Sequence, residues 1–287
     1  MAVAFASCDE HRDFPDTAMK TCDILCTDGK VVRFEEVKSQ NKTPIAVVFY
    51  VNQNEDIQGT GYAVYLKDIE PFAYSEFVLY EKDGYFWIRE GLLIENFYKI
   101  REDVTKFALA SYFCEVLDLV VYENMQETEL LRLGLNSFHA IANDLRPLPI
   151  IKAVFEMRAC LLLGFAPNME RCSVCGRKNA ASFCFSLMDG EIVCGDCRER
   201  ALHAYFATQR SVNAEEERRY ATQIYLISEN VRAAVRYLTT CPADKIYGFT
   251  MPEADVPQLC KLCEDHLTYR LEKKLRTLDF YHEVEAL

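Results

Sequence analysis

Two closely spaced pairs of cysteines constrain the fold of this chain more than any other feature of its sequence. The first pair lies in R-C-S-V-C-G-R at 171–177, and the second lies in V-C-G-D-C-R at 193–198. With two residues between its members, each pair can direct both thiolates at one ion through a single tight turn, and Gly176 and Gly195 supply backbone freedom beside those turns. Four thiolates match the tetrahedral preference of zinc. The spacing predicts one zinc ion bound by Cys172, Cys175, Cys194 and Cys197.

A site made of four thiolates has no open coordination position, so its predicted role is structural and not catalytic. Zinc binding of this kind contributes on the order of 10 kcal/mol to local folding, which matters for a segment too short to form its own core. An iron–sulfur cluster, a redox pair or four ordinary buried cysteines remain as alternatives. Cys184, between the two pairs, is interpreted as a packed thiol. Cys260 and Cys263 lie in a helical pattern, where core packing is favoured over a second half-site.

Composition narrows the class of protein further. The chain has 287 residues, of which 50% are hydrophobic and 26% charged, as expected for a globular protein. No apolar run is long enough to span a membrane, and the N-terminus lacks the basic flank of a signal peptide, so a cytoplasmic location is expected. In that reducing compartment the 13 cysteines are expected to bind metal or pack, not to form disulfides. The net charge of −12 weighs against a protein that simply coats DNA.

The first hundred residues are expected to form β structure. Runs rich in β-branched and aromatic residues cover 46–51, 62–66, 72–80 and 85–94. Asp83-Gly84, between the last two runs, is a typical hairpin signal, and Asp28-Gly29 is a second turn candidate with weaker strand patterns on both sides.

After about residue 100 the apolar spacing becomes helical. Asp103 is a plausible N-cap for the first helix, and Gly164 fits the end of the third. Cys241-Pro242 is a predicted break between two later helices. Beyond the first helix, the predicted helices cover 127–143, 148–163, 195–208, 220–239 and 256–276. The chain contains no phosphate-binding loop, no dinucleotide-binding motif and no H-E-x-x-H motif, so an enzyme is not expected.

The sequence before the first cysteine pair carries a family resemblance. The run F-E-M-R-A-C-L-L-L-G-F-A-P-N-M-E-R-C-S-V-C-G at 155–176 resembles the bacterial DNA repair protein family RecO, in which a helix ending in a Leu-Gly-Tyr/Phe-x-Pro element leads directly into the first zinc pair. Further segments that resemble this family lie at 70–80, 108–118, 185–197 and 270–280. The similarity covers about 70 to 287, whereas residues 1–65 depart from the family's pattern.

The resemblance implies an α+β multidomain fold. It places an N-terminal OB-fold-like β-barrel in 1–98 and an α-helical domain in 99–287, with an inserted four-cysteine zinc module at about 168–200. It also implies a non-enzymatic function in the RecF pathway of recombinational DNA repair. Proteins of this kind bind and anneal single- and double-stranded DNA, engage RecR and the C-terminal tail of the single-stranded DNA-binding protein, and help load the RecA recombinase.

The acidic balance supports an alternative function. In this alternative the protein is a zinc-stabilised adaptor that binds RecR or the single-stranded DNA-binding protein with little direct affinity for DNA. Direct DNA binding requires a basic surface, and each candidate cation could equally be an ordinary solvated residue. The candidates are Lys30, Arg33, Lys38 and Lys42 in the expected barrel, and Arg171, Arg177 and Lys178 beside the expected zinc.

Overall fold

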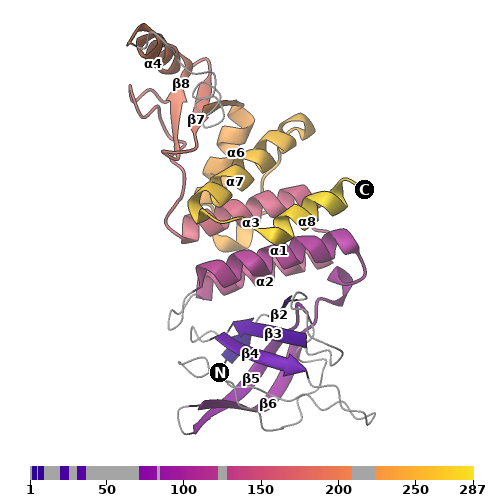
Figure 1. Ribbon diagram of the computed structural model, residues 1–287. Helices are drawn as coiled ribbons and strands as arrows, with labels where there is room; N and C mark the ends of the chain where they lie inside the picture. The colour runs from indigo at the N-terminus through magenta and orange to yellow at the C-terminus, as the bar shows by residue number, and fades with distance from the viewer. Residues whose placement is uncertain are drawn as a thin grey trace. The chain divides into compact units, whose positions relative to one another are not determined.

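Contacts within the computed structural model divide the chain into two compact units. Unit 1 comprises Met1–Leu145 and Leu275–Leu287, and unit 2 comprises Arg146–Lys274 (Figure 1). These units are defined by contacts in space, whereas the predicted domains, 1–98 and 99–287, are defined by the change from strands to helices along the chain. The domain division stays a prediction. The structure describes residues 2–4, 6–9, 20–25, 31–36, 71–82, 85–121, 128–208 and 224–287.

The strands of unit 1 pair into two antiparallel sheets of three strands each, with the orders β1-β5-β6 and β2-β3-β4. The described strands show no closed barrel. The strands are β1 (Ala2–Ala4), β2 (Ala6–Asp9), β3 (Lys20–Leu25), β4 (Val31–Glu36), β5 (Tyr74–Lys82) and β6 (Tyr85–Glu95).

Two of the predicted strands are confirmed as the hairpin of β5 and β6, in which Lys82 lies opposite Tyr85. Register shifts after Tyr74 and Val78 interrupt the pairing, and such bulges increase the local twist of a strand. β3 and β4 also pair, with Leu25 opposite Val31, on the two sides of the second predicted turn. The predicted strands at 46–51 and 62–66 and both predicted turns lie outside the described residues.

Three α-helices and a short 3-10 helix complete the described part of unit 1. Asp103 is confirmed as an N-cap, because its carboxylate accepts from the N–H groups of Thr105 and Lys106 at 2.8 and 3.0 Å. The ring of Phe72, buried before β5, lies edge-on to Phe107 and Phe138 at centroid distances of 5.2 and 5.4 Å, so aromatic packing joins the strands to the helices. The helices are η2 (Tyr98–Ile100), α1 (Val104–Val120), α2 (Thr128–Ala142) and α8 (Arg276–Glu285).

The C-terminal helix α8 packs on α1 and takes its N-terminal cap from it. The residue before α8, Leu275, has no side chain that can cap a helix. Instead, the carboxylate of Glu115 on α1 accepts from the backbone N–H groups of Arg276 at 3.1 Å and Thr277 at 2.9 Å, and from the Thr277 hydroxyl. These bonds satisfy donors that a helix start leaves open, so they hold the last helix in unit 1.

Unit 2 contains the helices α3 (Leu148–Leu162), α6 (Glu229–Thr240) and α7 (Val256–Leu271), with short 3-10 turns η3 (Ala243–Lys245) and η4 (Glu253–Asp255). The predicted end of α3 is confirmed, because Gly164 takes a positive φ of 81°. The N–H groups of Gly164 and Phe165 donate to the carbonyls of Leu161 and Cys160, as in a Schellman motif. The predicted break at Cys241-Pro242 is also confirmed.

Two predicted helix boundaries are wrong. The helix predicted over 220–239 begins only at Glu229, because Ile224–Ile227 forms strand β9 and Ser228 caps α6 by accepting from the Val231 N–H at 3.2 Å. The helix predicted over 256–276 ends at Leu271, because Glu272 takes a left-handed conformation with φ of 52°.

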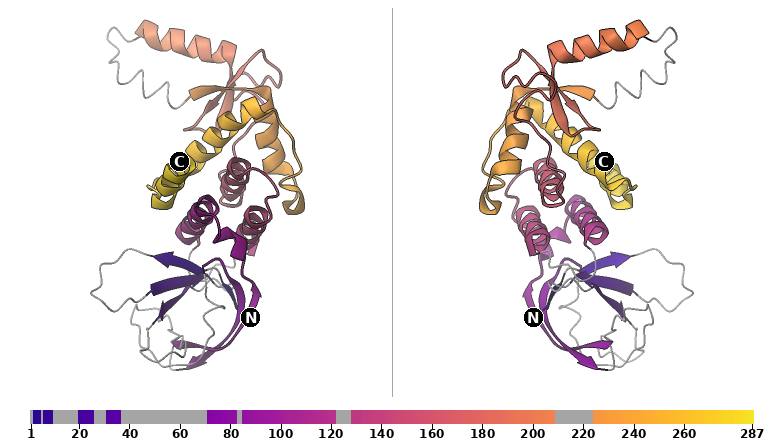
Figure 2. Two further views of the ribbon diagram at one scale, coloured as in Figure 1. Left: turned by 90° about the vertical axis from the view of Figure 1, so that its right-hand side faces the viewer. Right: turned by 90° about the vertical axis from the view of Figure 1, so that its left-hand side faces the viewer.

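A small antiparallel sheet in unit 2 carries part of the cysteine cluster. It has the order β8-β7-β9, with β7 at Phe183–Ser186 and β8 at Glu191–Cys194. The helix α4 (Gly195–Thr208), as predicted, follows β8 directly. Within this unit the sheet lies between α4 and the helices α6 and α7 (Figure 2).

α3 and α7 pack against each other in the core of unit 2 and enclose a charged group. The buried Nζ of Lys152 contacts Glu156 at 2.7 Å and Glu264 at 2.5 Å. The predicted packing role of two cysteines is confirmed, since Cys263 is fully buried and the half-buried Cys260 donates to the Pro149 carbonyl at 3.3 Å. None of the helices that the structure describes is long and apolar enough to cross a membrane.

Candidate metal centre

The sulfur atoms of the two cysteine pairs converge in unit 2. All four lie within 4.8 Å of one another, and the Sγ atoms of Cys175 and Cys194 are 3.7 Å apart. Thiolates at about 2.3 Å from a tetrahedral zinc are separated by about 3.8 Å, so the cluster has the dimensions of a single-ion site. An iron–sulfur cluster would place several metal and sulfide atoms between its ligands and needs more room. Cys184 lies outside the group, and the described part of the chain holds no second group of this kind.

The first pair lies on an irregular segment, which we call the first cysteine loop and define as residues 169–178. Two backbone hydrogen bonds form its turn, from the Cys172 N–H to the Arg177 carbonyl and from the Gly176 N–H to the Cys172 carbonyl, both at 2.9 Å. Gly176 has a φ of 74°, a conformation that glycine adopts without strain. The turn brings Cys172 and Cys175 to the same side.

The second pair lies where β8 ends and α4 begins. Cys194 is the last residue of β8, and Cys197 is in the first turn of α4. A Cβ atom at Gly195 would lie 2.5 Å from the Ser182 Oγ, so any larger residue at this position would force the Ser182 side chain to move. The two pairs are connected directly, because the Cys194 N–H donates to the Cys172 Sγ at 3.3 Å.

Burial and hydrogen bonding act differently on the thiols. Burial tends to raise the pKa of Cys172, but neighbouring backbone N–H groups outweigh it and lower that pKa to about 6. Burial raises the pKa of Cys194 to about 12. Cys175 is exposed, whereas the other three are buried. Four thiolates at this spacing repel one another unless a cation compensates their charge, which is the chemistry of a metal-ligand set.

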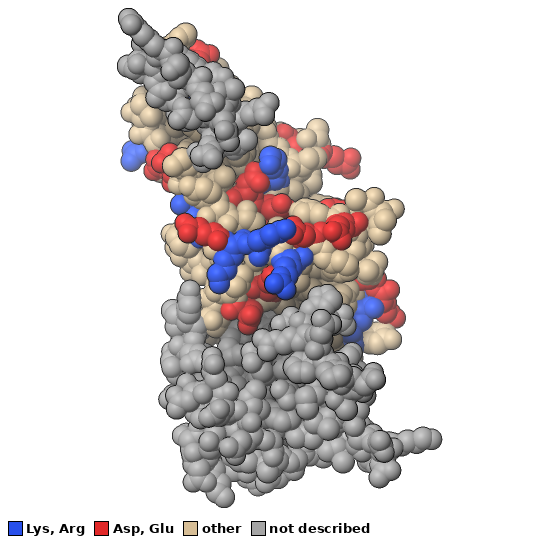
Figure 3. Space-filling view, in the orientation of Figure 1, with Lys and Arg blue, Asp and Glu red and all other residues tan. Residues whose placement is uncertain are grey.

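Cations surround the cluster, although acidic groups neutralise some of them. Arg200 Nη2 donates to the Cys197 Sγ at 3.0 Å, which offsets negative charge on that sulfur. Arg177, one of the predicted DNA contacts, pairs with Asp196 at 2.6 Å. On the face shown in Figure 3, acidic and basic side chains are interspersed among the described residues.

The other predicted DNA contacts are dispersed over the chain. Arg171 and Lys178 are exposed in the first cysteine loop. Arg33 lies in β4 opposite Asp23 of β3. The predicted contacts outside the described residues are Lys30, Lys38 and Lys42.

Reasoning from the sequence missed the arginines that bind the cysteine-bearing segment. Arg200 contacts the sulfur of Cys197. Arg232 on α6 binds backbone carbonyls of the first cysteine loop. Arg270 on α7 binds the carbonyls of Leu187 and Met188 in the turn between β7 and β8. A signal existed for Arg232, since it occupies the buried face of an amphipathic helix.

Comparisons with known proteins agree on one family. A family model described as "Recombination protein O C terminal" matches residues 101–217. The DNA repair protein RecO of Acetivibrio thermocellus is 28% identical over 215 residues, which cover 75% of this chain and 77% of that protein. The RecO protein of Caldanaerobacter subterraneus is 26% identical over 216 residues, or 75% of this chain and 79% of that protein. The RecO protein of Listeria monocytogenes serotype 4b is 31% identical over 129 residues, or 45% of this chain and 50% of that protein.

Proposed function

The chain belongs to the RecO family of bacterial DNA repair proteins, and from this membership we propose that it acts as a mediator of recombinational DNA repair. In this proposal it binds single- and double-stranded DNA, anneals complementary strands, and helps RecR to load the RecA recombinase in the RecF pathway. The observation that carries the proposal is the family-model match over 101–217, a range that contains both cysteine pairs. The proposed role is that of a binding protein and includes no catalytic step.

The proposed role of the four cysteines is to bind one structural zinc ion. The support is the dimensions of the sulfur cluster, with all four atoms within 4.8 Å of one another. Bound zinc would link the first cysteine loop rigidly to the junction of β8 and α4. We expect purified protein to contain one equivalent of zinc by elemental mass spectrometry and to take up zinc again after chelation. Protein that contains iron, or no metal after zinc is supplied, would contradict this assignment.

The proposed DNA-binding face lies in an OB-fold-like barrel formed by residues 1–98. The antiparallel strands of unit 1 are compatible with such a barrel. OB folds bind single strands through aromatic side chains and a groove lined by cations. The proposed contacts in this part are Lys30, Arg33, Lys38 and Lys42. Further contacts are proposed from Arg171, Arg177 and Lys178 beside the metal.

A second candidate function is favoured by the net charge of −12 and by the neutralisation of Arg177 through Asp196. In this alternative the protein is an adaptor that binds RecR, or the acidic C-terminal tail of the single-stranded DNA-binding protein, and has little affinity for DNA. The zinc site would serve the same structural purpose in both functions.

Titration of zinc-loaded protein into fluorescent single-stranded DNA, followed by anisotropy, separates the two functions. A mediator that contacts DNA directly should bind at low salt with a Kd on the order of 10 µM or tighter, and should release DNA as salt is added. An adaptor should bind a fluorescent peptide of the acidic tail but not the DNA. Folded, zinc-loaded protein that binds neither DNA, nor the peptide, nor RecR would contradict both functions.

A further inference from the structure

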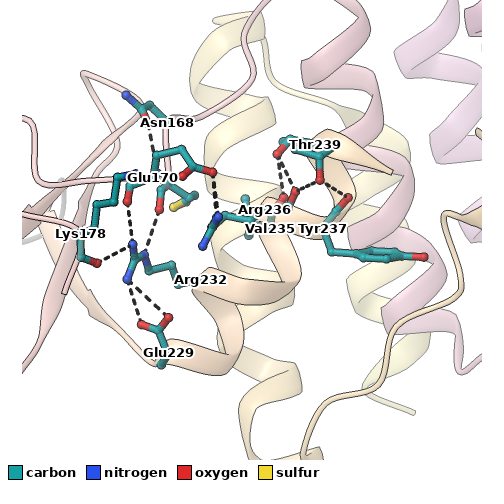
Figure 4. A network of polar contacts seen from close by, with 11 residues as sticks. Asn168, Glu170, Lys178, Glu229, Arg232, Val235, Arg236, Tyr237 and Thr239 are labelled. Atoms are coloured by element: carbon teal, nitrogen blue, oxygen red, sulfur yellow. Dashed lines mark hydrogen bonds and ion pairs between the residues drawn. The ribbon is translucent and has the colours of Figure 1, made fainter. Parts of the chain in front are cut away.

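Arg232 on α6 has only 4% of its surface exposed, and its guanidinium points toward the first cysteine loop (Figure 4). Its Nε donates to the Met169 carbonyl at 2.9 Å. Its Nη2 donates to the carbonyls of Glu170 and Lys178 at 2.9 and 3.0 Å. One buried side chain therefore binds three backbone carbonyls, of which that of Met169 is in a buried bond and would be unfavourable if unpaired.

The three carbonyls lie at opposite ends of the first cysteine loop. Met169 and Glu170 come before Cys172, and Lys178 follows Cys175. The two cysteines thus project from a loop whose entry and exit are joined by the same guanidinium. This contact involves none of the sulfur atoms, so it does not require a metal.

Two further contacts fix the orientation of the guanidinium. The carboxylate of Glu229 accepts from its Nη1, with a closest distance of 3.2 Å, and the Phe183 ring centroid lies 4.2 Å from its Cζ. Arginine presents its donors in a rigid planar fork, whereas lysine has one small ammonium group that cannot reach three carbonyls in this arrangement. The side chain at position 232 is therefore specific to arginine.

We propose that Arg232 is a positioning residue for the metal site, holding the first cysteine loop closed so that Cys172 and Cys175 are in place before the metal binds. This inference rests on the proposed zinc-binding function. An open loop would have to lose its conformational freedom when the metal binds, which weakens affinity. A loop closed by Arg232 loses that freedom when unit 2 folds, and its metal affinity is correspondingly higher.

Arg232→Lys tests the proposal because it retains the charge but removes the planar fork. We expect the zinc affinity of the full-length protein, measured by competition with a chromophoric chelator, to fall about 10-fold, as for other groups that support metal ligands indirectly. Arg236→Lys is the matched control. Arg236 lies one turn further along the same helix and contacts the Glu170 carboxylate at 2.9 Å, but its side chain is 44% exposed and touches no loop carbonyl in the described contacts. The zinc affinity of Arg236→Lys should equal that of the wild type.

Trypsin provides a second readout that does not depend on zinc. The first cysteine loop contains the exposed cleavage positions Arg171, Arg177 and Lys178. In full-length protein stripped of metal, we expect the wild type and Arg236→Lys to resist cleavage at these positions, and Arg232→Lys to be cut faster. Mass spectrometry of the fragments identifies the bond that is cleaved.

Circular dichroism shows whether Arg232→Lys retains its helices. If it unfolds, Glu229→Gln replaces it in the test, because the Glu229 side chain is 69% exposed and its loss disturbs only the orientation of the guanidinium. A loss of zinc affinity of about two- to three-fold is then expected. Folded Arg232→Lys with unchanged zinc affinity and cleavage would overturn the proposal, as would unchanged Glu229→Gln when Arg232→Lys unfolds. A wild type that binds no zinc would instead contradict the proposed zinc function, and the cleavage comparison would still test loop closure.

Discussion

The two cysteine pairs differ in what holds their backbone in place. The first pair lies on an irregular loop that is joined from outside by Arg232 of α6. The second pair lies on regular structure, with Cys194 ending β8 and Cys197 opening α4. The backbone of the second pair is therefore positioned by ladder and helix hydrogen bonds. That of the first pair is held by the two hydrogen bonds of its own turn, by the bond from the Ser173 N–H to the Ile192 carbonyl, and by a side chain far away in the sequence. A four-ligand site can thus combine one locally determined half with one half determined by tertiary contacts.

Removing one cysteine sulfur should have the largest effect on zinc content and stability. The effect should be the same whichever of the two cysteine pairs loses the sulfur. We expect Cys172→Ser and Cys197→Ser each to lose stoichiometric zinc and to destabilise the segment by several kcal/mol, because a tetrahedral site needs all four thiolates. Elemental analysis measures the zinc, and hydrogen exchange of β7 and β8 measures local stability. Retention of one equivalent of zinc by both variants would refute the four-thiolate assignment.

Glycine-to-alanine substitutions beside the two cysteine pairs should destabilise the protein for different reasons. Gly195→Ala places a Cβ 2.5 Å from the Ser182 Oγ and should lower the free energy of unfolding by about 1–3 kcal/mol. Gly176→Ala meets no atom within 4 Å, but its φ of 74° costs about 1 kcal/mol for alanine.

The added substitution Ser182→Ala makes this comparison sharper. It removes the clashing oxygen and leaves the next atoms 3.9 Å from the new Cβ of Gly195→Ala. We therefore expect it to restore the urea midpoint of Gly195→Ala but not that of Gly176→Ala. Equal recovery of both variants would show that the close approach at Gly195 is not what separates the two halves.

Lowering the pH should destabilise the hairpin of β7 and β8, which leads to the second cysteine pair. His266 is buried against Phe185 of β7, with ring centroids 5.5 Å apart. Burial lowers the pKa of His266, and the positive charge of Arg270 lowers it further. Because the folded pKa lies below the unfolded value of 6.5, the unfolded state takes up the proton first. Stability from this group is thus complete above pH 6.5 and declines as the pH falls below that value.

Urea unfolding at neutral and mildly acidic pH measures this effect, with the wild type compared with His266→Gln. The variant should be less sensitive to acid than the wild type, and the exposed residue His282 provides the control variant His282→Gln, which should behave like the wild type. Identical pH dependence in all three proteins would show that His266 does not set the acid response.

The smallest expected effect concerns DNA and the surface of the first cysteine loop. Lys178→Ala removes an exposed cation but leaves the carbonyl that Arg232 binds. If the loop contacts phosphate, DNA affinity should fall a few-fold and the salt slope should decrease by about 1. Arg177→Ala should have less effect, because Asp196 already neutralises that side chain. Anisotropy titrations at several salt concentrations measure both, and unchanged salt dependence for Lys178→Ala would remove this loop from the DNA-binding surface.

The features that could be predicted from the sequence are those with local causes. The cap at Asp103 and the helix end at Gly164 each depend on residues within one or two turns. The strand β9 depends on pairing with β7, for example Ile224 with Ser186, and a run of four apolar residues is ambiguous between strand and helix. The helix end at Glu272 has no glycine or asparagine to mark it.

The candidate site divides in the same way. The four cysteines could be predicted to cluster from their spacing, because the two members of each pair are separated by one short turn. The position of Arg232 on the apolar face of α6 could be predicted, but its partners could not, since it binds carbonyls 54 to 63 residues earlier and backbone carbonyls carry no side-chain signature. The neutralisation of Arg177 also could not be predicted from the sequence, because its partner Asp196 lies in the other cysteine motif.

The cap that Glu115 provides for α8 has a mechanical consequence. Because α1 and α8 both belong to unit 1, unit 2 is inserted between two segments that are fastened to each other. Tension applied between Val104 and Glu285 is transmitted across the contact of α1 with α8, and residues 146–274 lie outside that path. The cysteine cluster would experience a pulling force only after the C-terminal helix had been torn from α1.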